Sequence, residues 1–101
     1  MRDDLENKII QWHKDRNLIN GSTDLDQYQG KLLEEVDELG VNIAMGNKNG
    51  IVDDIGDIIV VLINIAHRNN LTLYECMHHA YNDIKDRKGK MIDGVFVKEA
   101  K

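Results

Sequence analysis

Hydrophobic residues recur at helical spacing near the start of the chain. Leu5, Ile9 and Trp12 are four and three residues apart, which predicts a helix over residues 3–16 with these side chains on its apolar face. Asp3 and Glu6 form a candidate capping pair at its start. Trp12, the one tryptophan, is interpreted as a core anchor or, alternatively, as a stacking surface for a nucleotide base. His13 is expected to be exposed on the surface, with a contact to the edge of a nucleotide base as the alternative.

A second helix is predicted over residues 24–44. Its apolar residues fall at three- and four-residue steps and share one narrow, core-facing stripe, made of Leu25, Tyr28, Leu32, Val36, Leu39 and Ile43. At roughly 100° per residue, Glu35 lies at the edge of this stripe and Glu34 lies nearly opposite its centre. Glu35 is therefore the carboxylate of this helix that we expect to be buried.

The longest apolar run of the chain lies within residues 51–69. Its unbroken Ile, Val and Leu residues suit a buried strand as well as a buried helix. Its length favours a helix, because strands typically end by about eight residues. A helix that is apolar on every side needs more partners than one small domain offers, so we expect a homo-oligomer, either a homodimer or a homotetramer.

Turn and cap residues divide the chain between these helices. Asn20-Gly21 predicts a turn, Thr23 is placed to cap the second helix, and residues 45–50 have the composition of a loop. Thr72-x-x-Glu75 is a capping box that opens a fourth helix. An Asp93-Gly94 turn within residues 91–97 predicts a short hairpin. The pattern as a whole predicts an all-α, four-helix bundle-like single domain over residues 1–101, with a C-terminal hairpin.

Composition narrows the classes of partner. The chain has 101 residues, of which 42% are hydrophobic and 31% charged, with a net charge of −5. This charge makes nucleic-acid polymers and anionic membranes poor partners, but it permits a small anion carried with a metal ion. The one cysteine, Cys76, excludes an internal disulfide, and no signal sequence or membrane span is recognisable, so we expect a cytoplasmic location.

Two acidic clusters stand inside the apolar helical patterns. One comprises Glu34, Glu35 and Glu38 of the second helix, and the other pairs Asp54 with Asp57 at the head of the apolar run. Carboxylates about 5 Å apart repel by roughly 3 kcal/mol per pair at an effective dielectric near 20, so burying them requires a cation. The hypothesis is a site for Mg²⁺, with Mn²⁺ as a substitute. A solvated acidic face is the alternative.

The register of the second cluster stays open. Asp54 and Asp57 are three residues apart on a helix, whereas Asp53 and Asp57 are four residues apart. Both spacings place two carboxylates on one face of a helix. Either pair could therefore hold one ion.

The acidic residues carry a family resemblance. Glu34-Glu35-x-x-Glu38 followed by Asp54-x-x-Asp57 resembles the E-E-x-x-E … E-x-x-D signature of the MazG-like all-α nucleoside triphosphate pyrophosphohydrolases. The resemblance extends to Gln27-x-x-x-Lys31 and to the tail over residues 81–98, which is similar to small, single-domain, phage-type members. Asp54 departs from the pattern, since the family usually has Glu there. The shorter side chain holds an ion directly or through a water.

The resemblance implies an activity and roles for these residues. It implies Mg²⁺-dependent hydrolysis of nucleoside or deoxynucleoside triphosphates between the α- and β-phosphates, giving the monophosphate and pyrophosphate. It implies metal ligands among Glu34, Glu35, Glu38, Asp54 and Asp57. It also implies that a carboxylate, among Glu34, Glu35 and Glu38, positions or deprotonates the attacking water.

Basic residues supply candidate contacts to the substrate. The fourth helix ends in a cluster, here called the basic cluster, made of Lys85, Arg87, Lys88 and Lys90. Cations at a helix C-terminus are favourable in any case, but in an acidic protein this is the patch suited to phosphate oxygens. Lys85, Arg87 and Asn82 are therefore predicted to contact phosphate or sugar. Lys31 either contacts phosphate or pairs with Glu35.

Two other functions are compatible with the sequence. One is a non-catalytic helical module whose acidic face binds a basic partner. The other is a superfamily relative dedicated to a single substrate, such as dUTP or phosphoribosyl-ATP. The absence of turnover would distinguish the interaction module from an enzyme. The range of substrates hydrolysed would distinguish the dedicated relative from a general nucleoside triphosphate pyrophosphohydrolase.

Overall fold

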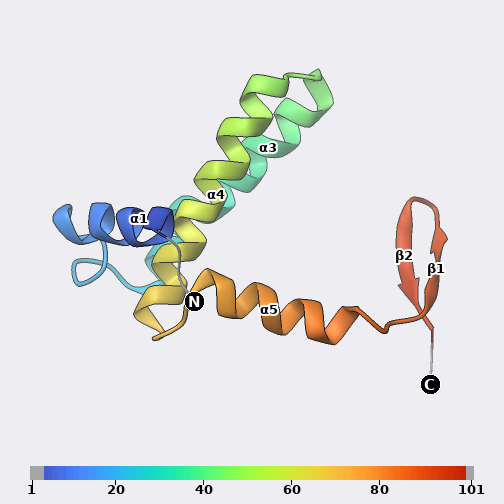
Figure 1. Ribbon diagram of the computed structural model, residues 1–101. Helices are drawn as coiled ribbons and strands as arrows, with labels where there is room; N and C mark the ends of the chain where they lie inside the picture. The colour runs from blue at the N-terminus through green and yellow to red at the C-terminus, as the bar shows by residue number, and fades with distance from the viewer. Residues whose placement is uncertain (1–3, 100–101) are drawn as a thin grey trace.

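Two antiparallel helices joined by a two-residue turn form the centre of the computed structural model, which describes residues 4–99 (Figure 1). They are α3 (Leu33–Met45) and α4 (Lys48–Arg68). Gly46 ends α3 in the left-handed conformation, with φ at 66°, and the Asn47 side chain accepts from the Gly50 N–H to cap α4. The loop predicted over residues 45–50 is thus shorter, because Asn47 caps a helix that already begins at Lys48.

The segment before α3 is helical, but it is not one regular helix. Thr23 caps α2 (Asp24–Gln27) in a reciprocal capping box with Asp26, as predicted for Thr23. A π-helical turn, η1 (Tyr28–Leu32), then leads into α3. A π turn carries more residues per turn than an α-helix, so the angles expected from a uniform helix do not hold across it.

Helix α1 (Asp4–Asp15) packs against α4 through a different face from the predicted one. Glu6, Ile10 and His13 are buried, whereas Leu5 and Trp12 are exposed. The buried residues have helical spacing, but each follows by one position a residue of the predicted apolar face. The reason is that His13 finds polar partners on α4, while Glu6 accepts from the backbone at the start of the last helix, at Leu73. The predicted capping residue Asp3 lies outside the described residues.

His13 joins a buried polar network rather than the surface, so the expectation of an exposed histidine is wrong. Its Nε2–H donates to the Val60 carbonyl at 2.9 Å, and its Nδ1 accepts from Asn64 Nδ2 at 3.2 Å. Asn64, fully buried, also donates to the Leu18 carbonyl, and its Oδ1 accepts from Arg68. The network fastens α1 and the following loop to α4, and its burial lowers the pKa of His13.

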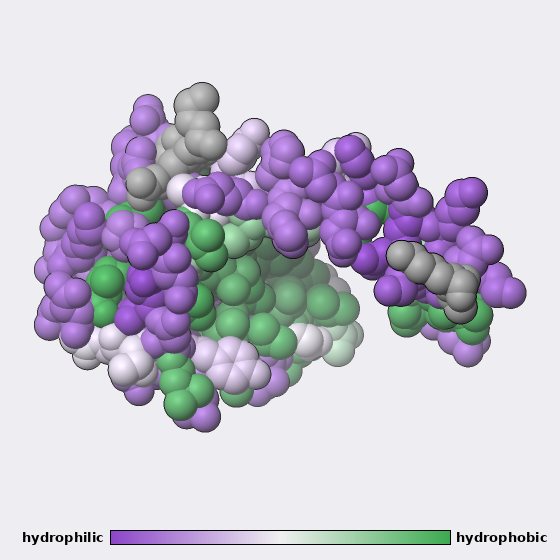
Figure 2. Space-filling view, turned by 90° about the horizontal axis from the view of Figure 1, so that it is seen from below, coloured by the Kyte–Doolittle hydropathy of each residue, from purple (hydrophilic) through white to green (hydrophobic). Residues whose placement is uncertain are grey.

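The hydrophobic core of the chain is small. The buried hydrophobic residues among those described are Ile10, Val61, Ile63 and Ala66. The stripe predicted to face a core on the second helix is largely open to solvent, because Leu25, Tyr28, Val36 and Ile43 are exposed. Figure 2 shows hydrophobic side chains gathered over the middle of one face of the molecule. The chain therefore buries much less of its apolar surface than its sequence pattern predicts.

The C-terminal residues form an arm that extends away from the other helices (Figure 1). The arm comprises α5 (Leu73–Ile84) and the antiparallel hairpin of β1 (Gly89–Ile92) and β2 (Val95–Lys98). Thr72 caps α5, and positive φ angles at Asp93 and Gly94 make the predicted two-residue turn. Glu6 fixes the base of the arm, since its Oε1 accepts from the Leu73 N–H at 2.6 Å.

The arm makes the molecule extended. The radius of gyration is 16.1 Å, against about 13 Å for a compact domain of this length. Helix α5, which corresponds to the predicted fourth helix, does not lie alongside α1, α3 and α4. One chain therefore does not close a four-helix bundle. The mostly helical fold and the hairpin agree with the prediction. Within the described residues, no helix has the length and apolar character needed to cross a membrane.

Candidate metal centre

Three carboxylates meet where α3 faces α4. Glu35 comes from α3, and Asp54 and Asp57 come from successive turns of α4. Each offers an oxygen, and these atoms all lie within 4.8 Å of one another. Glu35 is 3% exposed and Asp54 is 4% exposed, while Asp57 is open to solvent. The group is thus buried on one side and accessible on the other, as a site for an ion and its ligand requires.

Glu35 also belongs to a second group along α3. Its partners there are Glu34 and Glu38, which are both exposed and again offer oxygens within 4.8 Å of one another. The prediction that Glu35 is the buried carboxylate of this helix is confirmed. Because Glu35 belongs to both groups, the other four carboxylates predicted as ligands lie around it.

The two oxygens of Glu35 differ in their partners. Oε1 accepts from the Lys31 ammonium at 3.0 Å, so Lys31 makes the ion pair that was one of its two expected roles. Oε2 is buried without a hydrogen-bond partner. A buried carboxylate oxygen without a donor costs free energy, and a cation placed beside it removes that cost. The residues present therefore fit a divalent ion.

The crowding of negative charge around Glu35 also raises the pKa values of neighbouring carboxyl groups. The negative charge of Glu35 raises the pKa of Glu38, and desolvation followed by the charge of Glu35 raises the pKa of Asp57. The hydrogen bond to Glu35 raises the pKa of Lys31. One ammonium group does not offset the charges gathered here. Oxygen ligands with excess negative charge are the donor set that Mg²⁺ and Mn²⁺ prefer.

The structure chooses between the two registers that the sequence left open. Asp54, and not Asp53, joins Glu35 and Asp57, because Asp54 points toward α3 and is buried while Asp53 is exposed. Asp54 Oδ2 accepts from Asn42 Nδ2 at 2.6 Å. Asn42 was missed by the sequence analysis. Its signal is its spacing, since it follows Glu35 by seven residues and so lies on the same face of α3.

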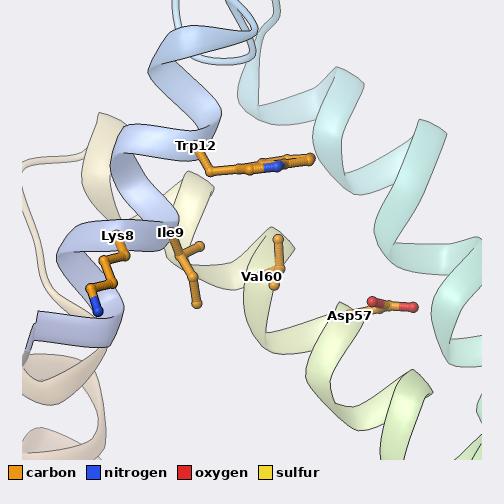
Figure 3. Close-up of a pocket in the computed structure, with 5 residues that line it drawn as sticks. All are labelled: Lys8, Ile9, Trp12, Asp57 and Val60. Carbon is orange, nitrogen blue, oxygen red and sulfur yellow. The ribbon is translucent and has the colours of Figure 1, made fainter.

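A cavity of about 410 Å³ adjoins the carboxylates and is lined by Lys8, Ile9, Trp12, Asp57 and Val60. Its size falls within the range of small-molecule sites. Figure 3 shows the Trp12 ring nearly edge-on above Ile9 and Val60, so that one ring face looks into the cavity. Lys8 points away from Asp57. The Trp12 side chain is 44% exposed and shares this cavity with Asp57. It is therefore not a core anchor.

The predicted phosphate contacts do not meet the carboxylates within one chain. Asn82, Lys85 and Arg87 lie at the far end of α5, where the arm leads away from α3 and α4 (Figure 1). Arg87 pairs with Asp83 at 2.8 Å, and Asn82 contacts His78 on the same helix. These contacts leave the basic cluster on the surface of the arm.

Comparison with known proteins found a similar curated protein. It is an uncharacterized 18.2 kDa protein in the rep-hol intergenic region of Haemophilus phage HP1, 41% identical over 63 residues. The match covers 62% of this chain and 38% of that protein, so the chain spans well under half of the length of this relative. No model of a protein family matches the chain, and no solved structure matches it.

Proposed function

We propose that this chain is a Mg²⁺-dependent nucleoside triphosphate pyrophosphohydrolase of the MazG-like type, which cleaves between the α- and β-phosphates. The observation that carries the proposal is the buried, unpartnered Oε2 of Glu35, which belongs to a carboxylate within ligand distance of Asp54 and Asp57. The same residues form the acidic motif on which the resemblance rests. Geometry supports a metal centre, and the motif supports the reaction.

Each carboxylate has a role in this proposal. Glu35, Asp54 and Asp57 hold the ion, which supplies Lewis-acid polarisation of the phosphate oxygens and a bound water of lowered pKa. Glu34 and Glu38 stand exposed beside Glu35 and are placed to orient the attacking water or accept its proton.

The cavity beside Asp57 is the proposed nucleotide site. A base stacked on the open face of Trp12 would rest on the apolar side chains of Ile9 and Val60. Its phosphates would then extend toward Asp57 and the carboxylates of α3. The Arg16 guanidinium lies over the Trp12 ring, 4.3 Å from its centroid, and this cation–π contact helps to hold the ring in place.

We also propose that the enzyme is a homo-oligomer. The exposed apolar side chains of α3 and α4 and the unsupported arm are surfaces that a second copy covers. The basic cluster, distant from the carboxylates of its own chain, would reach those of another copy. Lys85 and Arg87 would then contact the triphosphate in trans.

Product analysis tests the proposed reaction. The protein is incubated with Mg²⁺ and a panel of nucleoside and deoxynucleoside triphosphates that also includes phosphoribosyl-ATP. Pyrophosphate and orthophosphate are measured separately. We expect pyrophosphate and the monophosphate in equal amounts. Orthophosphate release would contradict cleavage at the α–β bond, and the absence of turnover on every substrate would favour the acidic interaction module. Turnover of dUTP or phosphoribosyl-ATP alone would identify a dedicated relative.

A further inference from the structure

We propose that Asn42 is a positioning residue that holds the Asp54 carboxylate for the metal ion, and that the turn between α3 and α4 sets the orientation of Asn42. The inference rests on the proposed metal centre and adds to it a group outside the acidic motif. It is carried by a chain of hydrogen bonds that begins at a backbone N–H and ends on Asp54.

The direction of every bond in this chain is fixed. The Gly50 N–H can only donate, and it donates to Asn47 Oδ1 at 3.1 Å. Asn47 therefore presents Nδ2, which donates to Asn42 Oδ1 at 3.1 Å. Asn42 in turn presents Nδ2, which donates to Asp54 Oδ2 at 2.6 Å. Because the first donor cannot reverse, neither amide is free to flip without losing a bond.

Gly50 also provides the space that Asn42 occupies. A Cβ at Gly50 would lie 2.5 Å from the Oδ1 and Cγ atoms of Asn42, closer than any ordinary contact. Gly50 lies in the first turn of α4, and alanine is generally favoured over glycine in helices, by about 1 kcal/mol in a helix interior. The turn thus carries a residue that is unfavourable for its own helix and compatible with the Asn42 side chain.

This arrangement serves Asp54 in particular. Asp54 is short, so its carboxylate has little reach and depends on its rotamer to meet an ion held by Glu35 and Asp57. The Asn42 amide occupies Oδ2 and leaves Oδ1 for the ion. An amide is neutral, so it orients the carboxylate without cancelling the charge that the ion requires. Groups that orient metal ligands in this way typically contribute about 10–100-fold to metal affinity.

Binding of Mn²⁺ alone, followed by the electron paramagnetic resonance signal of the free ion, tests the proposal. Asn42→Leu keeps the approximate size of the side chain and removes the donor, and we expect it to weaken Mn²⁺ binding about tenfold or more. Asn7→Leu, at an exposed position of α1, is the matched control and should bind as the wild type does. Circular dichroism in EDTA reports whether each variant is folded.

Two glycine variants provide an independent approach that leaves every polar group in place. Gly50→Ala should displace Asn42 and weaken Mn²⁺ binding, although alanine favours the helix. Gly40→Ala, in α3, adds a methyl group in open space and should leave binding unchanged. A purely structural role for Asn42 would instead change the thermal midpoint in EDTA and leave the Mn²⁺ affinity of both Asn42→Leu and Gly50→Ala at the wild-type value.

A double variant shows whether Asn42 acts through Asp54. Combining Asn42→Leu with Asp54→Asn should weaken Mn²⁺ binding no further than Asp54→Asn alone. Additive losses would overturn the proposal, as would wild-type affinity in Asn42→Leu and Gly50→Ala. Those outcomes leave the metal centre intact, because the wild-type protein still binds Mn²⁺. A wild-type protein that binds no Mn²⁺ would overturn both the metal centre and this inference.

Discussion

Glu35 is the residue on which the proposed metal centre most depends. A buried ion pair is seldom a net gain in stability over well-packed apolar residues. Here the pair is also incomplete, since Lys31 contacts one oxygen of Glu35 and the other is buried without a donor. A residue that costs stability in the isolated fold is explained most simply by a ligand that relieves that cost.

The neighbouring aspartates allow a sharp test of the ligand set. We predict that Asp54→Asn lowers both Mg²⁺ affinity and turnover by at least about tenfold, because it removes a buried charge from the centre. Asp53→Asn changes the adjacent residue of the same helix, which is exposed, and should stay near the wild type. Isothermal titration with Mg²⁺ and a steady-state rate assay measure the two effects. The opposite ranking of the two variants would mean that Asp53 faces the ion.

His13 predicts a pH dependence of stability. Burial lowers its pKa below the ordinary value of 6.5, with a further contribution from the charge of Arg68, and the bond to the Val60 carbonyl opposes the shift. The unfolded chain therefore binds a proton more readily than the folded one. The stability that neutral His13 provides is complete above pH 6.5 and is lost as the pH falls below that value.

Thermal midpoints in EDTA between pH 7.5 and 5 test this prediction. His13→Gln cannot titrate, so it should lose less stability on acidification than the wild type does. His79→Gln, at an exposed histidine of α5, should follow the wild type. Parallel curves for the wild type and His13→Gln would show that this histidine does not titrate within the network.

At the scale of elements, the helices were predictable and their buried faces were not. Local signals decide where a helix begins and ends, and Thr23, Thr72 and the Asp93-Gly94 turn behave as their sequence indicates. Which face is buried depends on neighbours. The buried face of α1 includes Glu6 and His13 because α4 and α5 supply polar partners for them. The spacing of apolar residues in α1 does not reveal these partners.

The grouping of the acidic residues, but not their role, can be compared with the prediction. The acidic motif contains the five carboxylates that the structure groups around α3 and α4. The position of Glu35 at the edge of the apolar stripe indicated its burial, although the π turn at Tyr28–Leu32 changes the helical angles from which that position was derived. Asn42 was not identified, because its one signal, the seven-residue spacing from Glu35, is shared by any polar residue on that face of a helix. Its role requires the approach of Asp54 from another helix.

The cavity between α1 and α4 gives a prediction for substrate binding. Trp12→Ala should raise the KM for a nucleoside triphosphate by about tenfold or more, because stacking on an aromatic ring contributes roughly 1–3 kcal/mol per base. Trp12→Phe keeps an aromatic face and should lose less. Steady-state kinetics separate KM from kcat, and kcat should change little. An unchanged KM in Trp12→Ala would place the base elsewhere.

At the scale of the whole molecule, the small core and the exposed apolar surface support the proposed homo-oligomer. We predict that the chain runs on a sizing column as a dimer or a larger oligomer. Tyr74, Met77, Tyr81 and Ile84 form an exposed apolar stripe along α5, and Met77→Glu should weaken the assembly by burying a charge. His79→Glu introduces the same charge at an exposed polar position and is the control. An active wild-type monomer at micromolar concentration would contradict this prediction.

Mixing two inactive variants tests whether the arm acts in trans. Arg87→Ala removes a proposed phosphate contact, and Asp54→Asn removes a proposed metal ligand. Subunits exchanged between the two variants should recover activity that neither shows alone, because one mixed site has both groups intact. Failure to recover activity in mixed oligomers would mean that the basic cluster does not serve another copy.

Thermal unfolding with and without Mg²⁺ tests most directly the central claim that Glu35, Asp54 and Asp57 hold a divalent ion. Mg²⁺ at ten times its dissociation constant should stabilise the wild type by about 1.4 kcal/mol and raise the thermal midpoint by roughly 5–10 °C. EDTA should reverse the shift, and Glu35→Gln should abolish it. Asp37→Asn, at an exposed residue of the same helix, is the control and should respond to Mg²⁺ as the wild type does. A wild-type midpoint indifferent to millimolar Mg²⁺ and to EDTA would contradict the account.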